Sequence, residues 1–393
     1  MAILKYTDVG IHSVSACVPQ KVVRNSELDN LIPKADLEKT IHSIGIRERR
    51  IAERDVCSSD LCSKAAERLL SEHGIDRDSI GALIFISQTP DYRQPSTAPS
   101  LQDRLGLPKT VMAFDINMAC SGYVYGLSIA YSLASQDGIG RVLLLVGETM
   151  SKTVSDHDKV TTPLFGDAGT ATLIEKGDGY GPSCFVLHSD GGGSDMLRVP
   201  YGGYRNPSST EGFERKVDEE GNILSGEQLH MRGMDVFNFG LRVVPSGIKE
   251  ILKVLGMGIE DVDIIHFHQA NRFMTDFFAK KLRFPLDRVP YSLGYFGIPV
   301  PPPASDCRGF GCPHDISLYD KESVSSERPM RILFFRKLGS FLNSSAYLCL
   351  FVLGEVRFSL NDGSDRYVPD GSLIVRSSVL YEVVLDSEKR ASS

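Results

Sequence analysis

The chain lacks the features of a membrane, secreted or nucleic-acid-binding protein. No apolar run reaches the roughly 20 residues that a spanning helix needs, and even the stretch 346–352 is far too short. The first five residues do not begin a long apolar region typical of a signal peptide. The net charge of −7 excludes a strongly basic surface. We therefore expect a cytoplasmic protein with no membrane and no nucleic-acid partner.

The sequence also lacks a complete metal or disulfide pattern. Its eight cysteines are scattered through 393 residues, unlike the dense framework of a small secreted domain. Cys307, Cys312 and His314 form a short cluster without a fourth ligand at a standard spacing, and His266 and His268 have no third ligand nearby. We expect no metal site.

Strand and helix patterns alternate through the first 300 residues, which predicts an α/β fold with helices on the faces of parallel sheets. A short capped helix is expected at 25–31, and a longer helix is expected to begin with Ser58 or Ser59 as its cap. Continuous apolar runs at 80–87 and 141–147 predict strands buried on both faces.

Two parts of the chain resemble each other. A helix, the residues 74–76 and a strand ending at 84–88 match a helix, the residues 258–260 and a strand ending at 265–269. The separation of about 180 residues is too long for a solenoid repeat and indicates a duplicated domain.

Cys120 lies where a predicted strand becomes a predicted helix. Ala119, Ser121 and Gly122 surround it and permit a close approach of the backbone. A thiol at the first turn of a helix is stabilised as thiolate by the helix dipole, which prepares a nucleophile. A small buried apolar residue is the alternative.

His268 ends a predicted buried strand and precedes Asn271 by three residues. A histidine at a strand terminus can reach a nucleophile that another strand brings there. A hydrogen-bonded core histidine is the alternative.

Three arginines could bind a phosphate-bearing partner, because the guanidinium group binds phosphate in a bidentate manner. Arg47 and Arg49 belong to a basic stretch at 45–51 that we expect to be exposed, and Arg272 lies close to His268. A solvated surface is the alternative for each. The glycine turn at 165–169 lacks a full dinucleotide-binding pattern and does not open a helix.

Four motifs of the chain stand in the order and spacing of one known family. They are residues 115–126 around Cys120, 147–149, 165–169 and 268–271. Together they resemble β-ketoacyl-acyl-carrier-protein synthase III from about residue 5 to residue 297.

The resemblance implies a thiolase-like fold, in which two similar halves are stacked as αβαβα layers, and a homodimer. We expect residues 1–177 to form the half that carries the nucleophile and residues 178–353 to form the half that carries the histidine. Residues 298–342 are atypical within the second half, and 354–393 form an extra tail of uncertain role.

The resemblance also implies a two-step acyl transfer. Acyl-CoA would load its acyl group onto Cys120, and malonyl-acyl carrier protein would then condense with it, losing CO₂ to give a 3-oxoacyl-acyl carrier protein. His268 would share the site with Cys120. Arg47, Arg49, Arg272 and Asn271 would bind substrate. The CoA thioester is a substrate, and no separate cofactor is expected.

Two departures from the family pattern are visible. The chain contains no tryptophan, so the family's tryptophan before residue 45 has no counterpart to stack on adenine. Ile298 stands where the family has an asparagine that donates a hydrogen bond during condensation. Two interpretations of 298–342 are open, a frameshifted segment or genuine divergence, and an impaired homologue or partner subunit is the alternative function.

Overall fold

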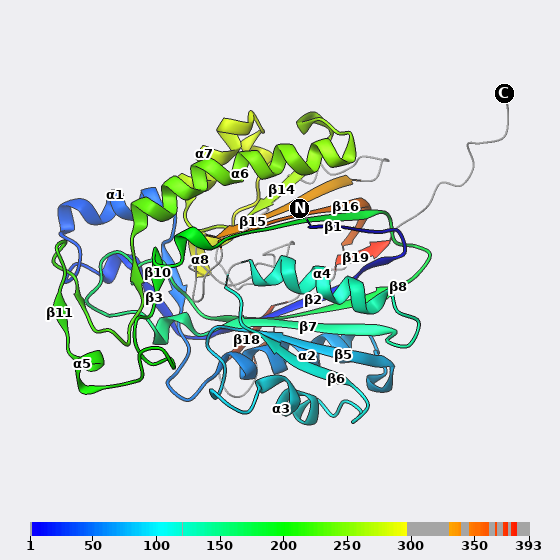
Figure 1. The fold of residues 1–393 in the computed structure, drawn as a ribbon, viewed down its shortest axis with the longest axis horizontal. Coiled ribbons are helices and arrows are strands. Elements are labelled where there is room, and N and C mark those ends of the chain that lie inside the picture. The colour runs from blue at the N-terminus through cyan, green and yellow to red at the C-terminus, as the bar shows by residue number, and fades with distance from the viewer. Residues whose placement is uncertain are drawn as a thin grey trace.

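Two large β-sheets and three layers of helices are stacked in the order helix, sheet, helix, sheet, helix (Figure 1). The computed structural model describes residues 2–119 and 121–296, and then the strands at 330–338, 346–360, 366–367, 372–375 and 379–382. Side chains are described through residue 294, apart from residue 120. This arrangement confirms the expected α/β fold with five layers.

The first sheet carries the strands that lead to Cys120. Its order is β17-β18-β2-β8-β7-β5-β6, and β5 lies parallel between β7 and β6. The bounds are β2 Val9–Pro19, β5 Ile80–Ile86, β6 Met112–Ile116, β7 Arg141–Glu148, β8 Ala168–Lys176, β17 Arg366–Tyr367 and β18 Ser372–Val375. The buried strands β5 and β7 confirm the prediction from their apolar runs.

The second sheet carries the strand that leads to His268. Its order is β1-β9-β16-β15-β14, and β19 pairs with β16 outside this path. The bounds are β1 Ala2–Tyr6, β9 Ser183–Asp190, β14 Ile264–Phe267, β15 Met330–Leu338, β16 Ala346–Leu360 and β19 Val379–Glu382.

The two sheets repeat one topology. In the first sheet, β5 and β7 are parallel, and β7, β8 and β2 follow in antiparallel pairs. In the second, β14 and β15 are parallel, and β15, β16 and β9 follow in the same way. A short 3₁₀ turn precedes both β5 and β14, at Arg77–Ser79 and Ile259–Asp261. The predicted duplication is confirmed, whereas the boundary at 177/178 stays a prediction.

The helices fill the three remaining layers. α2 (Ser58–Glu72) and α3 (Thr97–Arg104) cover the outer face of the first sheet. α6 (Gly233–Leu255) covers the outer face of the second sheet, and α7 (Arg272–Leu282) packs beside α6 and shares a core cluster with β14. α4 (Gly122–Ala134) lies between the sheets and contacts β5, β7 and β8 on one side and β16 on the other (Figure 1). Gly122, two residues after Cys120, therefore begins the helix of the central layer.

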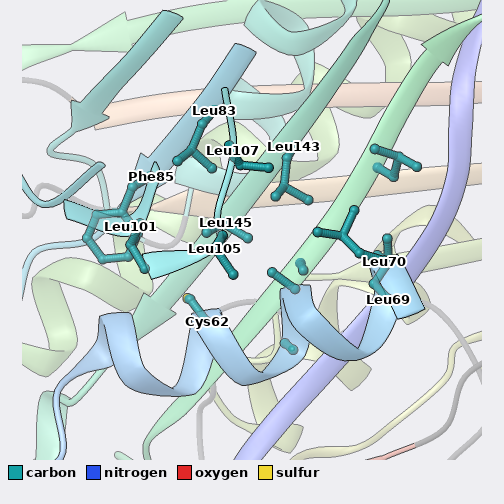
Figure 2. Close-up of a cluster of buried hydrophobic side chains, with 14 of the residues drawn as sticks. Cys62, Leu69, Leu70, Leu83, Phe85, Leu101, Leu105, Leu107, Leu143 and Leu145 are labelled. Atoms are coloured by element: carbon teal, nitrogen blue, oxygen red, sulfur yellow. The ribbon is translucent and has the colours of Figure 1, made fainter. Parts of the chain in front are cut away.

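α2 packs unusually close to the first sheet. Leucine and phenylalanine side chains from α2, α3, β5 and β7 form the core between them (Figure 2). A Cβ atom at Gly169 would lie 2.4 Å from the backbone nitrogen of Cys62, and one at Gly147 would lie 2.6 Å from its sulfur. Glycine is favoured at both positions, because the backbone of α2 occupies the space beside Gly169 and the side chain of Cys62 occupies the space beside Gly147.

Three expectations about local structure are wrong. The segment predicted as a helix at 25–31 is only a 3₁₀ turn, Asn25–Glu27, because the buried Asn25 amide donates to Ile46 O at 3.0 Å and to Pro163 O at 2.8 Å. α2 is capped by Cys57, one residue before the expected serines. Ser58 instead turns inward and donates from Oγ to Thr89 O at 2.9 Å.

The third error concerns the basic stretch at 45–51. Its residues Glu48–Arg50 form β4, which pairs with β3 (Val22–Arg24). The pairing buries Arg49 and Arg50, which are 4% and 7% exposed. Only Arg47 of the three arginines remains exposed.

Candidate active site

The segment around Cys120 joins β6 to α4. Cys120 itself lies outside the described residues, but its neighbours Ala119 and Ser121 are buried. A Cβ atom at Gly122, the first residue of α4, would lie 2.8 Å from Cγ2 of Ile86 on β5. The start of the helix therefore packs directly against the end of a sheet strand, and this close approach needs the small residue that the sequence places there.

His268 is the first residue after β14. Ile265 and Phe267 are buried in the core between the second sheet and the helices α6 and α7, and His268 is half-buried. Asn271 caps α7, since its Oδ1 accepts a hydrogen bond from Met274 N–H at 2.8 Å. This hydrogen bond stabilises the start of α7, which orients the turn that carries His268.

Gln269 fixes the turn after His268 and was not among the predicted site residues. Its side chain is 6% exposed. Oε1 accepts hydrogen bonds from Ser292 N–H at 2.9 Å and Leu293 N–H at 3.0 Å, and Nε2 donates to Pro290 O at 3.1 Å. Its only signal in the sequence is an amide residue beside a candidate catalytic histidine.

The structure brings Arg47 and Arg272 to one region, although the chain separates them widely. Arg47 N–H donates to Gly294 O at 2.9 Å. Gly45 closes α1 (Lys34–Ile44) with a φ of +76°, and a Cβ atom there would lie 2.6 Å from Cβ of Arg272. The left-handed backbone and the close contact both favour glycine.

The guanidinium group of Arg272 is held loosely at the surface. Its side chain is 57% exposed, and its Nε lies 3.8 Å from the Asp276 carboxylate. The guanidinium carbon also lies 5.0 Å from the ring centroid of Tyr291. Burial raises the pKa of Tyr291, which donates a hydrogen bond to Asp276. Arg272 and the exposed Arg47 are thus available to an anionic ligand.

Arg49 lies inside the protein instead. Its Nε donates to Oδ1 of Asn25 at 2.9 Å, and Nη1 lies 3.5 Å from Phe165 O. Burial lowers the pKa of the Arg49 guanidinium, an effect that the Asp167 carboxylate partly offsets. These contacts join the β4 segment to the residues before β8, which indicates a structural role in place of direct phosphate binding.

The glycine turn at 165–169 serves packing. Asp167 is fully buried and accepts hydrogen bonds from Ala52 N–H at 2.7 Å and Ser151 N–H at 3.0 Å. Burial raises the pKa of the Asp167 carboxyl group. Asp115 works similarly at the start of α3, where its oxygens accept from Thr97 N–H and Ala98 N–H, both at 2.7 Å.

Glu148, at the end of β7, is a second residue whose importance was missed. It is 2% exposed, and its carboxylate accepts hydrogen bonds from Gln88 N–H at 2.8 Å, Thr89 N–H at 3.1 Å and Thr89 Oγ1 at 2.7 Å. Ser87 Oγ lies 3.3 Å away. Burial raises the pKa of Glu148 to about 7, although the hydrogen bonds oppose this shift. Glu148 therefore fixes the segment that follows β5.

Neither a metal cluster nor a membrane span is found in the part of the chain that the structure describes. No group of three His, Cys, Asp or Glu residues there could hold a metal ion. None of the helices described is sufficiently long and apolar to cross a bilayer.

Comparisons with known proteins place the chain in a family. The family model described as 3-Oxoacyl-[acyl-carrier-protein (ACP)] synthase III matches residues 114–191, which include Cys120. The beta-ketoacyl-[acyl-carrier-protein] synthase III of Clostridium acetobutylicum is 35% identical over 290 residues, covering 74% of this chain and 85% of the relative. The corresponding protein of Caldanaerobacter subterraneus is 34% identical over 289 residues, covering 73% and 84%.

Solved structures agree with these relatives. The 3-oxoacyl-(acyl-carrier protein) synthase of Burkholderia xenovorans superimposes with a TM-score of 0.76 at 35% identity, over 90% of this chain and 96% of the other. A second 3-oxoacyl-(acyl-carrier-protein) synthase III gives a TM-score of 0.75 at 32% identity, over 87% and 99%. The chain therefore belongs to the 3-oxoacyl-[acyl-carrier-protein] synthase III family, whose members are transferases with a thiolase-like fold.

Proposed function

We propose that the protein is a condensing acyltransferase with Cys120 as its nucleophile. The Cys120 thiolate attacks the carbonyl carbon of an acyl-CoA, the bond to the CoA sulfur breaks, and CoA leaves as a thiolate that takes up a proton from solvent. Malonyl-acyl carrier protein then loses CO₂, and the resulting carbanion attacks the acyl carbon. A carbon–carbon bond forms, the bond to the Cys120 sulfur breaks, and 3-oxoacyl-acyl carrier protein is released.

One observation carries this proposal. Cys120 and His268 each follow the carboxyl end of a strand in one of the two equivalent sheets, within a chain of the synthase III family. The start of α4 favours a thiolate at Cys120 because its peptide dipoles place positive charge there. His268 would donate a hydrogen bond to the thioester oxygen as negative charge develops on it.

Arg47 and Arg272 are the arginines that we assign to phosphate binding. Both are exposed and lie on adjacent segments, joined by the contacts of Gly45 and Gly294. A pair of exposed guanidinium groups suits the phosphates of CoA or of a carrier-protein prosthetic group. We do not assign this role to Arg49, because its side chain is buried.

A second candidate function rests on Ile298, which lies outside the described residues. Isoleucine cannot donate the hydrogen bond that the family asparagine supplies, and loss of one such donor typically costs about 10²- to 10³-fold in rate. The protein would then load acyl groups onto Cys120 but condense them slowly, as an impaired homologue or a partner subunit.

A two-stage labelling experiment separates the two functions. The protein is incubated with radiolabelled acetyl-CoA, and malonyl-acyl carrier protein is added afterwards. Label on the protein that moves to a 3-oxoacyl product supports the condensing enzyme, and label that stays on the protein supports the impaired homologue. Cys120→Ala should abolish loading, while His268→Ala should retain loading and lose condensation. Loading by Cys120→Ala that equals the parent would contradict both functions.

We also propose a homodimer, in which two copies meet along β6. β6 ends the first sheet and pairs only with β5 among the described strands. Its residue Met112 is 47% exposed, and an unpaired edge with apolar residues invites a second strand. Light scattering should give twice the chain mass, and Met112→Lys should shift the protein toward the monomer. A monomer in the parent protein would refute the dimer.

A further inference from the structure

The amide nitrogen of Gln88 is buried and has no hydrogen-bond partner. Gln88 comes two residues after the end of β5. The backbone pairing with β6 continues one residue beyond the strand, because Ser87 N–H donates to Ile116 O at 3.3 Å. Gln88 therefore lies beside the segment that runs from β6 to Cys120. A buried amide donor without a partner is rare in folded proteins and calls for an explanation.

The alternation of β5 directs Gln88 toward the central layer. Leu83 and Phe85 belong to the core under α2 and α3 (Figure 2). Ile84 and Ile86 belong instead to the core around α4. Successive side chains of a strand point to opposite faces, so position 88 shares the face of Ile86. This is the face against which the start of α4 packs.

The backbone of Gln88 cannot easily turn its side chain elsewhere. Glu148 accepts hydrogen bonds from Gln88 N–H and Thr89 N–H, and Thr149 N–H donates to Thr89 Oγ1 at 2.9 Å. Three backbone donors thus fix the segment on both sides of the Gln88 side chain. The unpaired amide is part of a rigid structure and not the end of a loose loop.

The duplicated half shows how the fold treats the equivalent amide. Gln269 follows β14 at the position that corresponds to Gln88 in the repeat. Its Nε2 donates to Pro290 O at 3.1 Å, and its Oε1 accepts from two backbone N–H groups. The fold therefore satisfies this amide with protein groups in one half and leaves its donor unused in the half that carries the nucleophile.

We propose that Gln88 Nε2 donates a hydrogen bond to an oxygen that the acyl group carries beyond its thioester. The substrate class is then a hydroxy- or oxo-substituted acyl thioester. This inference rests on the proposed function, because it assumes that the acyl group is bound on Cys120. A bound oxygen would satisfy the donor, while an unsubstituted chain would leave it buried and unpaired.

The first test uses the unmodified protein and two acyl-CoA substrates that differ by one oxygen. Acylation of Cys120 is measured as CoA release from 3-hydroxybutyryl-CoA and from butyryl-CoA. We expect kcat/KM to favour the hydroxylated substrate by about 10-fold, the effect of one hydrogen bond to a buried neutral donor. A ratio of one or below overturns the proposal, whatever any variant does.

The second test replaces the donor. Gln88→Met keeps the length of the side chain and removes the amide, so the substrate ratio should fall to about one. Its melting temperature should equal or exceed that of the parent, because the variant buries no unpaired donor. Gln136→Met is the matched control, since Gln136 is exposed beyond the end of α4 and should keep the parental ratio.

The remaining outcomes separate this inference from the proposed function. An equal loss for both substrates in Gln88→Met would mean that the amide serves the thioester oxygen, and it would overturn the substrate class. An unchanged ratio in that variant would do the same. Loading without condensation leaves this test intact, because it measures only the first step. Failure of both substrates to acylate Cys120 would overturn the proposed function and this inference together.

Discussion

The segments after β5 and β14 occupy equivalent places in the two halves, yet they are held by different chemistry. After β14, His268 is followed by Gln269, whose neutral amide binds the backbone at 290–293. After β5, Ser87 and Gln88 are held by the carboxylate of Glu148, which comes from the neighbouring strand β7.

This difference indicates that the duplicated fold needs a buried acceptor at both places but does not prescribe its chemical type. Two backbone N–H groups must be satisfied beside each strand end, and either an amide or a carboxylate can accept from them. Only the carboxylate can change its charge. The Glu148 carboxylate should therefore respond to pH, whereas the Gln269 amide has no charge to change.

The largest effect is expected when the carboxylate is removed. Glu148→Ala leaves the backbone N–H groups of Gln88 and Thr89 without their buried acceptor, and each such group costs about 1–3 kcal/mol. We expect the free energy of unfolding to fall by about 4 kcal/mol, measured by urea denaturation.

The conservative variant sharpens this result. Glu148→Gln retains one acceptor oxygen, as Gln269 does in the other half, so its loss of stability should be less than half as large. A decrease under about 1 kcal/mol for Glu148→Ala would show that the segment after β5 does not depend on this carboxylate.

The second effect is the pH response of the same group. Burial raises the pKa of Glu148 from 4.5 to about 7, so the folded protein holds this proton more tightly than the unfolded chain. The contribution to stability is full below pH 4.5 and is lost as the pH rises through 7. The free energy of unfolding should decrease by about 3 kcal/mol across this window, at about 1.4 kcal/mol for each unit of pKa shift.

The contribution of other titrating groups is removed by subtracting the curve of a variant from that of the parent. Glu148→Gln has no proton to lose at this position, so the difference between its curve and that of the parent isolates Glu148. Parallel curves from pH 4.5 to 7.5 would refute the expected titration.

The smallest effect is expected at the other strand end. Gln269→Leu removes the acceptor for Ser292 N–H and Leu293 N–H and the donor to Pro290 O. Ser292 is half-buried, so water can replace the hydrogen bond from its N–H, and we expect a loss of about 2 kcal/mol in urea denaturation. Gln136→Leu, at an exposed position, is the control and should change stability little. A loss of stability as large as that of Glu148→Ala would contradict the expected order of the two effects.

Much of the fold could be predicted because its signals are local. The buried strands β5 and β7 are continuous apolar runs, and α7 begins at a capping asparagine, Asn271. The wrong predictions came where a tertiary contact overrode a local preference. Asn25 was expected to begin a helix, but its amide binds the distant carbonyl of Pro163. Arg49 was expected at the surface, but its strand pairs with β3 and buries it.

The candidate site divides in the same way. Cys120 and His268 were identified from motif order and from their positions at strand ends, although Cys120 lies outside the described residues. Glu148 and Gln269 were missed as anchors, because their partners lie about 60 and 20 residues away in the chain. No local pattern shows which backbone groups a folded chain will place beside such a side chain.

The amino-acid sequence by itself determined most of the strands and helices, the duplication and the family, because periodicity and motif spacing are properties of neighbouring residues. Only the tertiary structure decided which arginines reach solvent, that Arg47 and Arg272 lie on adjacent segments, and that Gln88 keeps an unused donor where Gln269 has none. These features depend on contacts between segments that are distant in the sequence. Burial and hydrogen bonding at such contacts are set by the packed fold as a whole.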